Sequence, residues 1–116
     1  VQGESNNTST NIGTLSVRGS NQVDFMVPGQ GSVKFNSVSL QSGSSIRVLI
    51  GADNTSDKFE VRVLDSNGNG SKLISDSGSV NGTIDIDTAG NYTISIVGKN
   101  SSSTKFHVTG TIIINY

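Results

Sequence analysis

The chain has 116 residues, which is room for one domain built on one hydrophobic core. Its formal net charge is −1 and its eight Lys and Arg residues are scattered singly, so we expect no nucleic-acid partner and no attraction to anionic lipid. The absence of cysteine excludes a disulfide scaffold, and no apolar run approaches the roughly 20 residues that membrane insertion requires.

The N-terminal stretch 1–11 contains one apolar side chain and no alternation, so we predict a flexible arm there. After it, apolar and polar residues alternate almost continuously, which indicates β-strands. Between residues 32 and 41 the apolar positions change from odd to even numbers. This change predicts a bulge, or a break between two short strands, near Asn36 and Ser37.

About nine strands follow one another at spacings near ten residues, with turn chemistry between them. Alternation is clear at 15–17, 23–27, 33–35, 38–40, 46–50, 59–63, 84–86, 92–96 and 106–108. We therefore predict an all-β protein, an antiparallel β-sandwich of jelly-roll type that forms a single domain over residues 12–116. The final "GTIIINY" is apolar, β-prone and uncharged, and we expect it to lie paired within a sheet, or alternatively to pair with another copy. Gly110 predicts a bend within that run.

A short stretch at 65–76 has the spacing of a calcium loop. It places Asp65, Asn67 and Asn69 at alternate positions, then Gly70, and Asp76 at the twelfth position, where calcium loops carry a longer Glu. The flanking residues have the period of strands and not of helices. We therefore favour a metal-free β-hairpin whose tip uses Asn and Gly, and keep calcium at these residues as the alternative.

Other oxygen ligands for a calcium ion are available on separate strand connections. The candidates are Asp53, Asn54 and Asp57 in one loop, Asp65 or Asp76 in another, and Asp85 with Asp87 on one strand face. Each of them is also explained as a solvated carboxylate or amide that keeps the protein soluble. We predict no cofactor apart from this candidate calcium.

Catalysis has little support in the sequence. The single histidine, His107, stands between apolar Phe106 and Val108 in an alternating run and is expected to face solvent. There is no G-x-S-x-G elbow, and Asp85 and Asp87 are two residues apart on a flat strand, where carboxylates rarely frame a scissile glycosidic bond. We expect no enzyme activity.

Sugar recognition usually depends on exposed aromatic platforms, and the chain has no tryptophan. Tyr116 and Tyr92 remain as contacts. We expect Tyr92 to be a core residue whose hydroxyl reaches the rim of the domain.

The sequence also suggests export. It begins at Val1 without the features of a signal peptide, which favours a mature chain numbered from its processed end, although a cytosolic protein or a domain boundary would look the same. Lack of cysteine is frequent among secreted proteins of Gram-positive bacteria. Asn-x-Ser/Thr sequons begin at Asn6, Asn7, Asn54, Asn69, Asn81, Asn91 and Asn100, and we attribute most of them to composition.

Residues 59–98 contain a strand that ends in an Asp-x-x-Gly-Asn turn at 65–69, a polar stretch, an apolar strand, and "AGNYTISI" at 89–96. This order resembles the second half of the bacterial pre-peptidase C-terminal domains, and "QVDFMV" at 22–27 is similar to their Asp-x-Phe-x-Phe strand. The resemblance implies a secreted jelly roll related to the collagen-binding domains of clostridial collagenases. Members that bind calcium use an acidic N-terminal linker, whereas "GESNNTST" here has only Glu4 as an acid.

Together these features predict a secreted or surface-associated bacterial module without catalysis that binds an extracellular polymer or protein. A first alternative is a matrix or coat protein that self-assembles through strand edges and exchanges the "GTIIINY" end or the N-terminal arm. The second is a small secreted enzyme inhibitor that presents a loop such as "GADNTSD" at 51–57. The chain is accordingly expected to be a monomer or a strand-edge homo-oligomer.

Overall fold

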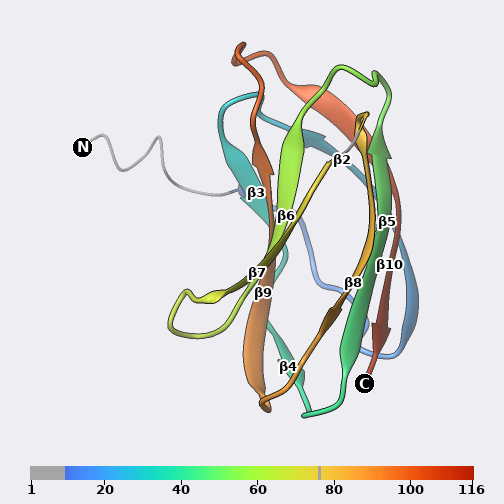
Figure 1. Cartoon of the computed structure of the whole chain (residues 1–116), viewed down its shortest axis with the longest axis vertical. Coiled ribbons are helices and arrows are strands. Elements are labelled where there is room, and N and C mark those ends of the chain that lie inside the picture. Colours follow the sequence, from blue (N-terminus) through green and yellow to red (C-terminus); the bar gives the residue numbers. More distant parts are fainter. Residues whose placement is uncertain (1–9, 76) are drawn as a thin grey trace.

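The computed structural model describes residues 10–75 and 77–116, and these form an all-β sandwich (Figure 1). The strands are β1 (Thr10–Asn11), β2 (Gly19–Val27), β3 (Ser32–Lys34), β4 (Val38–Leu40), β5 (Ser45–Ala52), β6 (Phe59–Leu64), β7 (Gly70–Ile74), β8 (Ser79–Asp85), β9 (Gly90–Gly98) and β10 (Phe106–Asn115). The all-β class and the sandwich are thus confirmed, with ten strands where about nine were predicted. None of the described residues is helical, so a helix long and apolar enough to cross a membrane is absent from this part of the chain.

The strands form two layers. The first sheet has the order β1-β3-β9-β6-β7, with β4 also pairing with β9, and the second sheet has the order β2-β10-β5-β8. All pairs are antiparallel except β1 with β3, which is parallel. In the described residues, β6 and β7 are the one pair of consecutive strands that are also neighbours in a sheet. Most connections therefore cross from one layer to the other.

The N-terminal boundary differs from the prediction. Thr10 and Asn11, the last two residues of the predicted flexible arm, form β1 against Val33 and Lys34. Both side chains are exposed, so the sequence shows no apolar alternation that would predict this strand. The rest of the predicted arm, residues 1–9, lies outside the described residues. The alternation at 15–17 belongs to the connection between β1 and β2 and not to a strand, although Leu15 is buried.

The change of parity near Asn36 and Ser37 is a break between two strands, as predicted. β3 pairs with residues 95–97 of β9, and β4 pairs with residues 90–92 of the same strand. The break lets apolar side chains from both strands face the core, and Val33, Phe35, Val38 and Leu40 are all buried.

The C-terminal run is paired within a sheet, as expected. β10 lies in the middle of the second sheet, with β2 on one side and β5 on the other. Gly110 adopts a φ of 150°, and an added Cβ would lie 2.1 Å from the carbonyl oxygen of Leu49, so a side chain has no room there. Because both edges of β10 are used, exchange of this strand with another copy would first require breaking two ladders.

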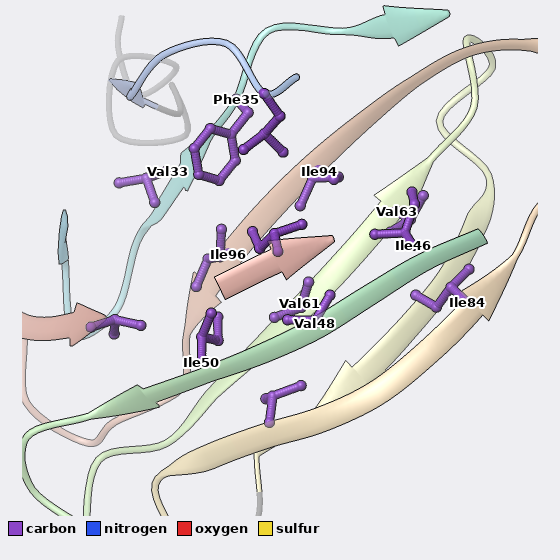
Figure 2. Packing of buried hydrophobic residues seen from close by; sticks show 14 of the residues in the cluster. Val33, Phe35, Ile46, Val48, Ile50, Val61, Val63, Ile84, Ile94 and Ile96 are labelled. Atoms are coloured by element: carbon purple, nitrogen blue, oxygen red, sulfur yellow. The ribbon is translucent and has the colours of Figure 1, made fainter. Parts of the chain in front are cut away.

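Branched aliphatic side chains from the two sheets fill the space between the layers. In Figure 2, residues of β5 and β8 (Ile46, Val48, Ile50, Ile84) lie opposite residues of β6 and β9 (Val61, Val63, Ile94, Ile96). Two aromatic pairs also bridge the sheets. The ring centroids of Phe25 and Phe35 are 5.9 Å apart, and those of Phe59 and Phe106 are also 5.9 Å apart.

Replacing Gly98 by alanine tests the close approach of β9 to the connection after β2. A Cβ at Gly98 would lie 2.0 Å from the carbonyl oxygen of Pro28, whereas a Cβ at Gly90 would meet nothing within 4 Å. We expect Gly98→Ala to lower the free energy of unfolding by about 1–3 kcal/mol. Gly90→Ala, the matched control, should change it by less than about 0.5 kcal/mol. Urea denaturation measures both, and equal values for the two variants would contradict this packing.

Candidate functional site

Three connections gather at one end of the sandwich, and we call this end the loop end: residues 28–31, 53–58 and 99–105 (top in Figure 1). Backbone hydrogen bonds tie them together. The N–H of Lys99 donates to the carbonyl of Lys58 at 2.8 Å, and the N–H of Asn100 donates to the carbonyl of Gly29 at 2.9 Å. The side-chain amide of Gln30 donates to the carbonyl of Ser101 at 2.8 Å. The three connections thus form one hydrogen-bonded unit.

The side chain of Asn100 is the main link between the 53–58 and 99–105 connections. Its Oδ1 accepts the N–H of Lys58 at 2.7 Å, and its Nδ2 donates to Oδ1 of Asp57 at 3.0 Å. Within the 53–58 connection, Oδ1 of Asn54 accepts both the N–H and the hydroxyl of Ser56. This connection is therefore held in one shape from inside and from its neighbour.

The surface is hollowed on both sides of the 53–58 connection. One open hollow of about 840 Å³ lies between it and the 99–105 connection, and its charged lining includes Asp53, Lys99 and Lys105. A second hollow of about 450 Å³ lies between it and the β7–β8 connection, with Thr55 and Ile74 in its wall. The 53–58 connection therefore stands as a ridge between two depressions.

His107 lies at the border of the loop end on the outer face of the second sheet, between two carboxylates. Its Nδ1 is 2.9 Å from Oδ2 of Asp53, and its Nε2 is 2.6 Å from Oδ1 of Asp24. The hydrogen bond to Asp24, and then that to Asp53, raise the pKa of His107 above its usual value. Both ring nitrogens face carboxylates and neither faces a hydroxyl, so the imidazole is not arranged as the base of a nucleophile.

The calcium-loop residues lie at the tip of the β6–β7 hairpin, which confirms the hairpin. Oδ1 of Asp65 accepts the backbone N–H groups of Asn67 at 2.9 Å and Asn69 at 3.0 Å, so this carboxylate oxygen is directed into its own turn. The N–H of Asp65 donates to the carbonyl of Asn69 at 2.7 Å. Asp76, the fourth predicted ligand, lies outside the described residues, so calcium at this set stays a prediction.

The remaining predicted ligands are distributed over the molecule. Asp53, Asn54 and Asp57 point to three different partners at the loop end. Asp85 and Asp87 are exposed and, together with Asp65, line a shallow hollow of about 330 Å³. In residues 10–75 and 77–116, no three His, Cys, Asp or Glu side chains are grouped so that they could hold a metal ion.

The two tyrosines differ in burial. Tyr92 packs against the core and its hydroxyl donates to the carbonyl of Thr88, as expected for a core residue that reaches the rim. Tyr116 is exposed, and the guanidinium of Arg18 lies 5.1 Å from the centre of its ring.

Sequence reasoning found the 51–57 loop but missed its partner, the 99–105 connection. The signal for that partner was weak, because "KNSSSTK" reads as an ordinary polar turn. The function of Asn100 as a link could not be read from it, since it depends on a contact with residues more than forty positions away.

Known proteins resemble this chain in fold and not in sequence. No family model matches the sequence, and no curated protein matches it significantly. The structure is similar to PliG of Aeromonas hydrophila, a periplasmic lysozyme inhibitor of g-type lysozyme, with a TM-score of 0.70 and 12% identity over 94% of this chain and 99% of that one. PliG of Salmonella Typhimurium has a TM-score of 0.59 and 12% identity over 93% and 100% of the two chains.

The pre-peptidase C-terminal domain of collagenase from Bacillus anthracis is also similar, with a TM-score of 0.58 and 7% identity over 94% of this chain and 96% of that domain. The predicted resemblance to these domains is therefore confirmed at the level of the fold. The chain has a β-sandwich fold that inhibitor proteins and pre-peptidase C-terminal domains share.

The two carboxylates around His107 can be tested separately by NMR, because the chain has a single histidine whose ring signals are easily identified. Since the pKa of His107 is raised, its contribution to stability is complete below its ordinary value of 6.5 and declines as the pH rises through the raised value. We expect Asp24→Asn to lower this pKa more than Asp53→Asn, because the bond to Asp24 is the larger cause. A ring that titrates identically in all three proteins would contradict the arrangement.

Thermal melting with calcium or with a chelator tests the calcium loop. A ligand present at 100 times its Kd stabilises the folded state by about 2.7 kcal/mol, which moves Tm of a domain of this size by several degrees. We expect a shift below about 2 °C, since the hairpin tip is closed by its own hydrogen bonds. A larger difference between the calcium and chelator samples would establish a metal site, and Asp65→Asn would then have to abolish it.

Proposed function

We propose that this chain is a non-catalytic module that binds another protein with its loop end and inhibits an enzyme of the g-type lysozyme class. The observation that carries the proposal is the ridge at 53–58, which is held rigid and has a depression on each side. A loop that is already fixed before binding loses little conformational entropy on association. Loops clustered at one end of a sandwich are also the usual place for recognition in this architecture.

The charge of the loop end supports a glycoside hydrolase as the partner. Lys58, Lys99 and Lys105 line the larger hollow together with Asp53 and Asp57, whose carboxylates are already hydrogen-bonded to His107 and Asn100. Enzymes that cleave glycosidic bonds work with a pair of carboxylates in the substrate cleft. Cations on the ridge and its borders would complement the charge of such a cleft and would speed encounter with it.

The similar structures point to the same class of partner. Two of them are named as inhibitors of g-type lysozyme, and each aligns along nearly its whole length, so the inhibitor fold and this chain have the same extent. Both are named as periplasmic, and we propose an exported location for this chain as well. Self-assembly through the C-terminal strand has less support than enzyme inhibition, since β10 is paired on both sides.

The test is inhibition of a purified g-type lysozyme acting on peptidoglycan. We expect near-stoichiometric inhibition by the wild-type chain. Thr55→Glu combined with Ser103→Glu places two negative side chains at exposed positions of the loop end, where they oppose the carboxylates of the cleft, and should weaken inhibition at least tenfold. Ser66→Glu at the exposed hairpin tip is the matched control and should inhibit as the wild type does.

Melting curves must show that the variants remain folded. If the wild-type chain neither inhibits the enzyme nor forms a complex with it in analytical ultracentrifugation, the proposal is wrong for this class of target. Equal weakening by the loop-end and the hairpin variants would show that a different surface makes the contact.

A further inference from the structure

Most of the basic residues lie on one surface, the outer face of the first sheet, although they are scattered in the sequence. We call this surface the basic face, and define it by Lys34, Lys58, Arg62, Lys72 and Lys99, five of the eight Lys and Arg residues of the chain. Each of the five stands next to a buried residue, or for Lys72 the partly buried Leu73, in an alternating strand or its extension, which directs all of them away from the core. The sheet therefore gathers cations that the sequence separates.

Three of these cations form a row across the strands. Lys34 in β3 is opposite Ser95 in β9, Ser95 is opposite Arg62 in β6, and Arg62 is opposite Lys72 in β7. With neighbouring strands about 4.8 Å apart, the row is about 14 Å long. Lys58 and Lys99 extend the positive charge along β6 and β9 toward the loop end, where the N–H of Lys99 donates to the carbonyl of Lys58.

One carboxylate, Glu60, is placed among these cations and pairs with two of them, Arg62 and Lys72. Only 8% of its surface is exposed. Its Oε2 accepts hydrogen bonds from Nε of Arg62 at 3.1 Å and Nη2 at 2.9 Å, while Oε1 lies 3.8 Å from Nζ of Lys72. Burial raises the pKa of Glu60, but the hydrogen bond from Arg62 and the charges of Lys99, Arg62 and Lys72 outweigh burial and hold it below its usual value.

The other described carboxylates lie away from the row of cations. Asp24 and Asp53 lie with His107 at the second sheet, and Asp65, Asp85 and Asp87 line a hollow of their own. Asp57 is hydrogen-bonded to Asn100 and shares a hollow with Lys58 and Lys99, outside the row of Lys34, Arg62 and Lys72. Five cations with Glu60 and the neighbouring Asp57 still leave the basic face positive, whereas the whole chain has a formal net charge of −1. Overall charge thus cannot draw a polyanion to this protein, and only a local surface can do so.

The shape of the basic face favours a linear polymer over a lipid surface. Among the described residues, Ile74 is the one large apolar side chain exposed on this face, with 65% of its surface exposed, so little is available to enter a bilayer. The row of cations crosses the strands on an open sheet and offers contacts at intervals along a line. A chain of sugars with repeated negative groups can meet several of these contacts at once.

We propose that the basic face binds a linear polyanionic glycan lying across β3, β9, β6 and β7. Lys58 and Lys99 border the ridge at 53–58, whereas the row of Lys34, Arg62 and Lys72 lies outside it, so a polymer on the row and an enzyme on the ridge could be held by the same module. Binding here does not depend on whether the loop end inhibits a lysozyme.

The experiment measures affinity for dextran sulfate, for polygalacturonate and for neutral dextran at low and high salt. We expect the wild-type chain to bind the two charged polymers at low salt, to release them at high salt, and to show no binding to neutral dextran. The two charged polymers distinguish sulfate from carboxylate as the preferred group. Lys34→Gln with Lys72→Gln should weaken binding at least tenfold and leave inhibition by the loop end unchanged.

The matched control, Arg18→Gln with Arg47→Gln, removes the same charge outside the basic face and should alter affinity by less than twofold. Both double variants change exposed side chains, and urea denaturation verifies that they fold. Absence of binding by the wild-type chain at low salt, or an equal loss in the two double variants, would overturn the proposal. Binding to phosphatidylglycerol vesicles without binding to either charged polymer would overturn it in favour of a membrane surface.

Discussion

The structure depends on the packing of two layers of branched aliphatic side chains. Each buried Val, Ile or Phe contributes about 1.5–3 kcal/mol when it leaves water, and the side chains between the two sheets are almost all of these types. Because most connections cross from one sheet to the other, each layer is assembled from segments that are distant in the sequence. The loop end and the basic face are rigid because this core fixes the strands that carry them.

Apolar alternation was enough to predict the local part of the fold. It located most strands, the break at Asn36 and Ser37 and the hairpin at 65–69, since each depends on residues that are close in sequence. It failed for β1, whose two polar residues are held by backbone pairing with β3 and bury nothing. Propensity carries no information about a strand of that kind.

The candidate sites were harder to predict from the sequence, because they depend on the register in which distant strands pair. The contact of His107 with Asp24 and Asp53 joins residues separated by 83 and 54 positions. The cation row likewise needs three pairings between four strands, and a shift of one residue in any of them would turn that strand's side chains to the other face. Single lysines in a sequence therefore say little about charge on a surface.

The position of β10 between β2 and β5 has a consequence for how the molecule folds. β10, which lies between β2 and β5, is also the last of the described strands, so β2 has no partner in this sheet until β10 is in place. Pairings between distant segments form slowly, on the scale of milliseconds to seconds in proteins dominated by non-local contacts. The second sheet consequently closes only when the segment of β10 has found both β2 and β5, so this one strand governs how fast the sandwich is completed.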